Sequence, residues 1–252
     1  RREGFKSGEF DLYKEYRASQ CVRSHRGPKW ESGRIAKQTY TIQTGSMPQS
    51  INLNLRRPQF QDIRVREAII RAYDYDKYNL YGTFDASDSL FNNTEFAAQG
   101  QPGPDELALL EPHRASLPKE VFGPPWRVPR YSGTANGLRD SLRRAQELLA
   151  DAGWKPGPDG LLRNAAGERL TVELLEPQQT GRLPAFARNL KKLGIEYKER
   201  LVDFSLFRRR LEAFDYDINI IVEPKFTLPD AGQVGSLYGT ESALKPGGQN
   251  FR

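Results

Sequence analysis

The sequence predicts an α/β fold, in which helices cover a sheet. Between residues 170 and 222, strand, helix, strand, helix and strand patterns follow one another in short succession. Two amphipathic helix patterns precede this series, one beginning near residue 62 and one spanning 136–154. Such alternation implies a sheet with helices packed on at least one face. The 252 residues are enough for one large or two ordinary domains.

The first part of the chain contains short elements. We expect a helix end at Phe5–Gly8 and strands at Glu9–Tyr16 and Ile35–Thr44, where apolar and polar positions alternate.

An alternating strand, Ser50–Leu55, leads into an arginine-rich helix. Asp62 can cap the free amide groups of the first helical turn. The apolar stripe of this helix consists of Val65, Ala68, Ile69, Ala72 and Tyr73. Arg64 and Arg71 fall off the stripe, so we interpret them as solvated or locally paired side chains rather than as a grip on a polyanion.

Prolines recur between Gly82 and Ser132, where the pattern loosens. Only Asp105–Pro112 is typical of a brief helix. A loop of this length in a compact domain is either functional or held by anchoring side chains. The aromatic residues that could anchor it are Phe91, Phe96, Phe122 and Trp126.

The second half of the chain is the most regular. Apolar residues at helical spacing predict a helix over Asn136–Trp154, with Gly153 as its stop. Asp159-Gly160 and Ala166-Gly167 supply turns on either side of a short strand. The elements expected to follow are a strand at Leu170–Leu175, a helix at Gly181–Leu193 closed by Gly194, a strand at Ile195–Val202, a helix at Ser205–Phe214 and a strand at Tyr216–Val222.

Charge and composition argue against several classes. The net charge of +6 comes from 38 basic and 32 acidic residues, which are mixed along the chain rather than gathered in a basic stripe with aromatics, so nucleic-acid binding is disfavoured. No stretch approaches the apolar length of a membrane span. The single cysteine, Cys21, cannot form an internal disulfide and leaves cytosol and periplasm open. The chain starts without Met or a signal-peptide core and ends in GGQNFR, and we interpret it as an internal fragment.

Residue chemistry favours a binding module over an enzyme. His25 and His113 stand far apart without other ligands at metal-binding spacing. The nucleophile motif G-x-S-x-G and the glycine-rich phosphate motifs are missing. Asp215 and Asp217 share one side of a strand, but paired carboxylates act as acid and base only when burial separates their pKa values. We interpret that pair as a solvated strand face or turn, and we expect no metal and no cofactor.

Three segments carry a family resemblance. SINLNLRRPQFQDIRVREAIIRAYDYD follows the pattern N-x-x-x-x-P-F-x-D-x-R-V-R-x-A-[IL]-x-x-A-x-D, with the proline displaced by one residue. RAQELLADAGW with DGLLRNAAGERLTVELL, and LKKLGIEYKERLVDFSLFRRRLEAFDYDI, are similar to further motifs of the same family. The chain thereby resembles family 5 of the extracellular solute-binding proteins, the peptide, dipeptide and nickel receptors of bacterial ABC importers. The matching positions of the first pattern are Asn54, Pro58, Phe60, Asp62, Arg64, Val65, Arg66, Ala68, Ile69, Ala72 and Asp74.

Within that family the chain is most similar to the branch that takes up oligopeptides and the peptide antibiotic microcin C. FKSGEFDLYKEY, LRRPQF and the segment Ser89–Phe122 carry this similarity. Ala86 replaces an arginine that is usual in the branch, so a ligand or inter-lobe contact by that arginine is not expected here. TLPDAGQ (Thr227–Gln233) replaces a common SPGN.

The resemblance implies a two-lobed fold of the periplasmic-binding-protein type, in its large peptide-binding class (class II). Two crossing segments would form the hinge, near Ser50–Leu55 and Tyr216–Val222. Residues 51–218 would form a complete lobe II, whereas residues 1–50 and 219–252 would belong to a partial lobe I.

The resemblance also implies capture without chemistry. A solute would bind between the lobes, the lobes would close over it, and the closed form would dock on a membrane permease. Family members contact ligand just past the second crossing, so Glu223 would bind an amine and Lys225 a carboxylate, whereas the asparagines would serve the hinge. The candidate ligand-binding residues are Val222, Glu223, Lys225, Phe226, Glu15, Arg17, Asn52 and Asn54.

The expected ligand is an oligopeptide or related solute, held by its backbone and by one or two charges at its termini. The expected partner is an ABC permease, and the protein is expected to be a periplasmic or extracellular monomer that does not bind nucleic acid. The alternatives are a receptor for an opine or sugar conjugate, a sensory solute-binding domain, and an enzyme on a similar scaffold. Ordinary exposed loop charges are the other interpretation of Glu223 and Lys225.

Overall fold

The computed structural model describes residues 1–15, 18–40, 45, 48–79, 85–131, 136–177, 183–224, 228 and 230–252. They form two compact units, of which the first comprises Arg1–Ile42 with Asn79–Asp85 and the second Gln43–Tyr78 with Ala86–Arg252. These units are defined by contacts within this chain, and the division into ligand-binding lobes stays a prediction.

The first unit is helical in its described part. Its helices are α1 (Arg2–Ser7), α2 (Ala18–Arg23) and α3 (Pro28–Glu31). Helix α1 ends at Gly8, as expected, and Phe10 and Tyr13 pack on Phe5 at ring-centroid distances of 5.9 and 5.8 Å. Residues 9–15 and 35–40 form no strand, so the two strands predicted there are wrong over those residues. Phe10 and Tyr13 instead join Phe5 in an aromatic cluster. Tyr16 and residues 41–44 lie outside the described residues.

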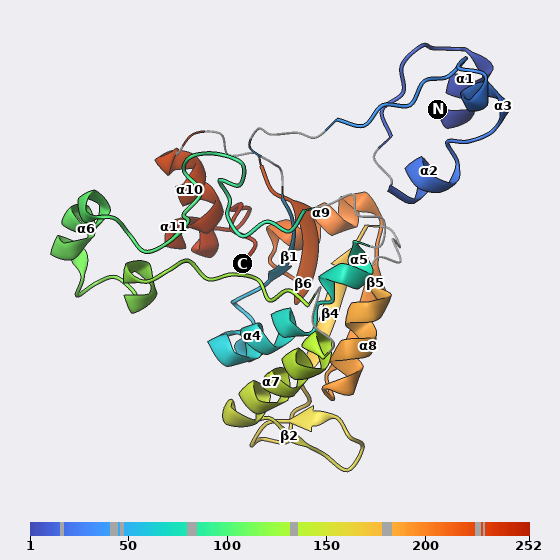
Figure 1. The fold of residues 1–252 in the computed structure, drawn as a ribbon. Helices are drawn as coiled ribbons and strands as arrows, with labels where there is room; N and C mark the ends of the chain where they lie inside the picture. Colours follow the sequence, from blue (N-terminus) through green and yellow to red (C-terminus); the bar gives the residue numbers. More distant parts are fainter. Residues whose placement is uncertain are drawn as a thin grey trace. The chain divides into compact units, whose positions relative to one another are not determined.

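A four-stranded mixed sheet organises the second unit (Figure 1). Its order is β1-β6-β4-β5, in which β1 and β6 are antiparallel whereas β4 is parallel to both β6 and β5. The strands are β1 (Gln49–Leu53), β4 (Thr171–Glu176), β5 (Glu196–Leu201) and β6 (Ile218–Val222). The sequence predicted all four, with ends shifted by one or two residues, and the α/β class is confirmed.

Helices pack on both faces of this sheet because its strands alternate their side chains. Val172 and Leu174 of β4 join a large core with helices α4, α7 and α8, whereas Leu175 joins a smaller core under α9 with Phe207 and Tyr216. The helices are α4 (Ile63–Arg71), α7 (Gly137–Asp151), α8 (Pro184–Lys192) and α9 (Phe204–Glu212). All four were predicted, the first two from their apolar stripes, and residues 181–182 of the predicted third helix lie outside the described residues.

Capping and glycine residues set the ends of these helices. Asp62 accepts a hydrogen bond of 2.8 Å from the backbone N–H of Arg64, as predicted, and Asp203 caps α9 in the same way. Gly194 ends α8 with φ 79°, and a Cβ at this position would lie 2.8 Å from the carbonyl oxygen of Gly160. Glycine therefore allows both the turn and the close approach of the neighbouring hairpin.

The remaining elements are short and mostly exposed. The loop predicted between Gly82 and Ser132 carries a brief helix, as expected, but none of its four candidate anchoring aromatics is buried. The elements are η1 (Pro58–Phe60), α5 (Tyr75–Tyr78), α6 (Pro104–Leu110), η2 (Glu111–His113), η3 (Lys119–Phe122), β2 (Lys155–Pro156), β3 (Leu162–Arg163), α10 (Ala231–Tyr238) and α11 (Thr240–Leu244).

Candidate ligand-binding site

The two predicted crossing segments lie side by side as strands β1 and β6. Their register places Asn52 opposite Asn219, and Asn52 Nδ2 donates a hydrogen bond of 3.3 Å to Asn219 Oδ1. Both side chains are buried, and Asn219 Nδ2 has no acceptor among the described residues. The sheet therefore holds a polar pair in an apolar setting, where an unpaired donor is costly.

Asn54 fixes the entry to β6. Its side chain is fully buried, and Nδ2 donates to the carbonyl oxygens of Phe214 and Tyr216, each at 2.9 Å. Phe214 has a φ of 55°, which is unusual for a residue other than glycine. Asn54, directly after β1, thus holds the left-handed turn that follows α9 against the first of the two predicted hinge segments.

Arg56 connects this strand to the C-terminal segment of the chain. Its guanidinium group donates to the carbonyl oxygens of Ala243, Asn250 and Arg252, and its Cζ lies 3.5 Å from the ring centroid of Phe214. Burial lowers the pKa of Arg56 from its usual value. This arginine of the opening motif is therefore a structural cross-link, held by carbonyl oxygens and an aromatic face.

Glu223 directly follows β6 and is fully buried. Its backbone N–H donates to the carbonyl oxygen of Pro48 at 2.8 Å, and its Oε1 accepts from Arg252 Nη2 at 2.5 Å. The Arg252 guanidinium in turn lies 4.4 Å from the ring centroid of Tyr238. Glu223 Oε2 has no donor among the described residues, so the carboxylate keeps acceptor capacity that another donor could use.

A cavity of about 360 Å³ lies next to this ion pair, at the end of β1. Arg252 and Tyr238 form part of its wall, together with Arg56. The complete lining is Leu55, Arg56, Tyr238, Thr240, Ala243, Leu244, Asn250 and Arg252.

The structure brings only some of the predicted site residues together. Asn52, Asn54, Val222 and Glu223 gather around the paired strands, and the Val222 side chain is 58% exposed. Lys225, Phe226 and Arg17 lie outside the described residues. Glu15 belongs to the first unit, where its Oε2 lies 3.4 Å from His25 Nε2.

The interpretation of Glu223 as an ordinary exposed loop charge is wrong, since its side chain is buried and paired. Four further residues around these strands were not predicted as site residues: Asn219, Arg56, Tyr238 and Arg252. Asn219 could have been found, because it is the one polar residue in the strand sequence INIIV. The contact of Arg252 with Glu223 left no local signal in the sequence.

The paired carboxylates Asp215 and Asp217 are held by Arg57, at 3.3 and 3.2 Å. Burial raises the pKa of Asp217, while the backbone N–H of Glu173 and the charge of Arg57 oppose this effect. Asp217 is therefore less solvated than expected. Its side-chain contacts are with the backbone N–H of Glu173 and with Arg57.

In the part of the chain that the structure describes, no three His, Cys, Asp or Glu side chains gather in a way that could hold a metal ion.

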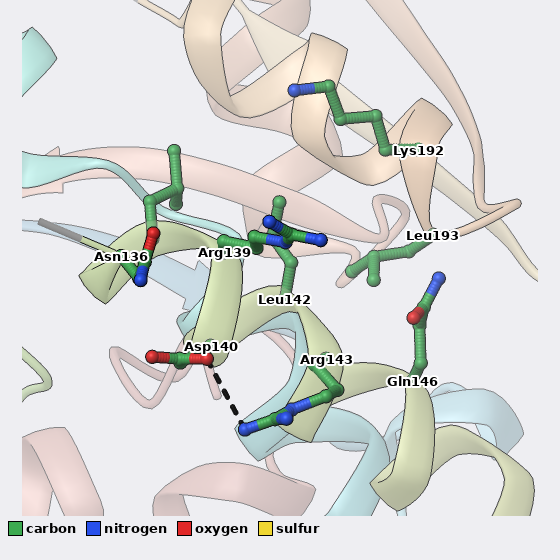
Figure 2. A pocket seen from close by; sticks show the side chains of 9 residues that line it. Asn136, Arg139, Asp140, Leu142, Arg143, Gln146, Lys192 and Leu193 are labelled. Atoms are coloured by element: carbon green, nitrogen blue, oxygen red, sulfur yellow. Dashed lines mark ion pairs between the residues drawn. The ribbon is translucent and has the colours of Figure 1, made fainter.

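A second hollow lies between α7 and α8 and measures about 620 Å³ (Figure 2). None of the predicted site residues lines it.

Among the described helices, none combines the length and the apolar character needed to cross a membrane.

The fold and the site define a class: an α/β scaffold in which the edge strand β1 and its neighbour β6 carry a buried amide pair, with a buried ion pair directly after β6. The family match is specific, since residues 1–241 match the sequence profile of "Bacterial extracellular solute-binding proteins, family 5 Middle". The chain belongs to this family, which is one of binding proteins rather than enzymes.

Curated relatives support this assignment. The chain is 35% identical over 222 residues to "Uncharacterized protein YejA" of Escherichia coli, and 30% identical over 257 residues to "Probable peptide-binding protein YejA" of Agrobacterium fabrum. It is 29% identical over 245 residues to "Peptidoglycan-binding protein YepA" of A. fabrum. These matches cover 86%, 99% and 92% of the chain but only 36%, 41% and 40% of the relatives.

A solved structure supports the fold. The oligopeptide-binding protein AppA of Bacillus subtilis, in complex with a nonapeptide, matches 82% of this chain and 36% of its own length, with a TM-score of 0.52 and 21% identity. The chain thus corresponds to part of a two-lobed periplasmic peptide-binding fold.

Proposed function

We propose that this chain is part of the substrate-binding component of an ABC importer. The protein captures an oligopeptide or related solute between two lobes and delivers it to a membrane permease. The match of residues 1–241 to a solute-binding family carries this proposal, and the peptide-binding name of a relative that is 30% identical supports the ligand class. A periplasmic location, a monomeric state and the lobe division at residues 51–218 belong to the same proposal.

Glu223 gives the proposal a chemical basis. A buried carboxylate that is paired through one oxygen keeps a second oxygen for the ammonium group of a peptide. If the ligand ammonium group donates to this oxygen only when the lobes are closed, the bound ligand favours the closed state. A ligand shifts a two-state equilibrium only by its difference in affinity for the two states.

The second candidate ligand is a sugar conjugate of a peptide, as found in peptidoglycan. The printed name of one relative, "Peptidoglycan-binding protein YepA" of A. fabrum, favours this ligand. An opine receptor and a sensory domain remain alternatives that the same experiments address.

The test is to purify the full-length protein from its host and identify the bound solute by mass spectrometry. A peptide supports the main proposal, a muropeptide the second candidate, and an opine would overturn both. If no peptide or muropeptide raises the melting temperature of the emptied protein, the receptor function is rejected. Import by the reconstituted permease separates transport from sensing.

Glu223→Gln tests the ammonium contact. The parent protein is expected to bind a peptide with a free amino terminus about 10-fold more tightly than its acetylated form, which corresponds to one charge-assisted hydrogen bond. The variant should lose this preference, whereas the exposed-site control Glu241→Gln should keep it. An unchanged preference in Glu223→Gln would remove this residue from the site.

A further inference from the structure

The groove between α7 and α8 has a positively charged rim. Three cations, Arg139, Arg143 and Lys192, line it against one carboxylate, Asp140. Arg143 pairs with Asp140 at 3.3 Å, whereas Arg139 and Lys192 have no ion pair or side-chain hydrogen bond within the described ranges. Two positive charges are thus left for an outside partner.

Charge on the neighbouring helix surface has the same sign. The sequence of α8, PAFARNLKK, contains no acidic residue, and its Arg188, Lys191 and Lys192 are exposed. The lining of the groove carries three cations and one carboxylate, and such a net positive surface raises the local concentration of a negatively charged partner and speeds its association.

Apolar side chains line the floor of the groove. Leu138 and Leu142 are half-buried and Leu193 is buried. Figure 2 shows Leu193 extending toward α7, which carries Leu142 and Arg139, while Lys192 extends from α8. Asn136 and Gln146 add amide groups that can bind a peptide backbone.

This combination suits a segment of protein chain better than a lipid surface. A volume of about 620 Å³ holds several side chains in a concave site, whereas a membrane offers a broad, flat sheet of charge. An apolar floor with a cationic rim complements a segment that carries both acidic and apolar side chains.

We propose that the groove between α7 and α8 docks an acidic, partly apolar segment of a protein partner. The partner is the membrane permease that receives the solute, and in this respect the inference rests on the proposed function. Arg139 and Lys192 supply the charge complementarity, and the half-buried Leu138 and Leu142 supply the apolar contact.

The test compares two full-length variants with the same change in charge. Arg139→Glu/Lys192→Glu reverses the charge of two side chains that line the groove, and the control Arg209→Glu/Lys245→Glu reverses the charge of two exposed side chains elsewhere. Binding of the solute-loaded protein to the purified permease in nanodiscs is measured at low and at physiological salt. The groove variant should bind the permease at least about 10-fold more weakly than the parent, mostly through slower association, and the difference should shrink at higher salt. The control variant and the solute affinity of both variants should stay near the parent values.

Several results would overturn the inference. If the groove variant and the control bind the permease with equal affinity, the inference is wrong. It is also wrong if the melting temperature falls in the groove variant alone, because this result would indicate that another part of the full-length protein covers the groove. Loss of binding to phosphatidylglycerol vesicles with unchanged permease binding would assign the surface to lipid. If the parent binds solute and permease but the groove variant is unaffected, the inference fails and the receptor function stands; if the parent binds neither, both are rejected.

Discussion

Replacing Asn54 by alanine is expected to destabilise the protein strongly, although the residue is small and bears no charge. Its Nδ2 makes two hydrogen bonds of 2.9 Å to the carbonyl oxygens of Phe214 and Tyr216, and its side chain is fully buried. Tyr216 O also accepts from Arg57 Nε at 3.0 Å and stays satisfied, whereas Phe214 O is left without its side-chain donor.

The magnitude follows from these contacts. Alanine also removes Oδ1, which accepts from the backbone N–H and from Nη1 of Arg56, each at 3.2 Å. Four lost hydrogen bonds contribute about 0.5–1 kcal/mol each, and an orphaned buried carbonyl adds about 1 kcal/mol, so the free energy of unfolding should fall by about 3–5 kcal/mol. For a protein of this size each kcal/mol lowers the melting temperature by roughly 2–4 °C, which gives a shift of about 6–20 °C.

The assay is urea and thermal unfolding of the full-length protein, followed by circular dichroism and calorimetry. The matched control is Asn136→Ala, since this exposed asparagine makes no capping hydrogen bond at the start of α7; its effect should stay within about 0.5 kcal/mol. A loss below about 0.5 kcal/mol for Asn54→Ala would show that the left-handed turn at Phe214 does not depend on this amide, and the reasoning would be refuted.

The remaining predictions concern the helix cap, one glycine and the core. Asp62→Ala should cost about 1 kcal/mol at neutral pH; the hydrogen bond from Arg64 lowers the pKa of Asp62, so this contribution is present above the unfolded pKa of about 4 and is lost as pH falls through the lower folded value. A constant difference between parent and variant down to strongly acidic pH, in urea unfolding, would contradict it. Gly194→Ala combines a left-handed φ of 79° with a Cβ 2.8 Å from Gly160 O and should cost about 1–3 kcal/mol, with a melting temperature equal to that of the parent as the contrary result. Phe60→Ala removes a fully buried ring from the core beside α4 and should cost about 3–5 kcal/mol in denaturant unfolding, whereas a loss under about 1 kcal/mol would mean that the core collapses around the site.

The regular half of the fold could be predicted because its signals are local. The stripe of α7, the cap at Asp62 and the glycine at 194 each specify one element from neighbouring residues. The strand Ser50–Leu55 was predicted from its alternation, whereas its antiparallel pairing with β6 was not predicted.

Features that depend on a contact with a residue far away in the sequence could not be predicted from neighbouring residues. Polar and apolar residues alternate over Glu9–Leu12 as in a strand, yet a strand exists only where a second one supplies hydrogen bonds. The burial of Glu223 depends on Arg252, which lies 29 positions away. The family resemblance placed the candidate site near the end of β6, whereas the ion pair of Glu223 with Arg252 could not be anticipated from residue types.

The pairing of Asn52 with Asn219 also has a kinetic consequence. The two residues are 167 positions apart, whereas β4, α8, β5, α9 and β6 follow one another within 52 residues. Long loops must close before distant contacts stabilise anything, and distant pairings slow folding. The parallel part of the sheet should therefore assemble first, and β1 should be added last as the edge that completes it. During synthesis, the strand bearing Asn52 leaves the ribosome long before its partner does, and its unpaired edge is where premature association with other chains would begin.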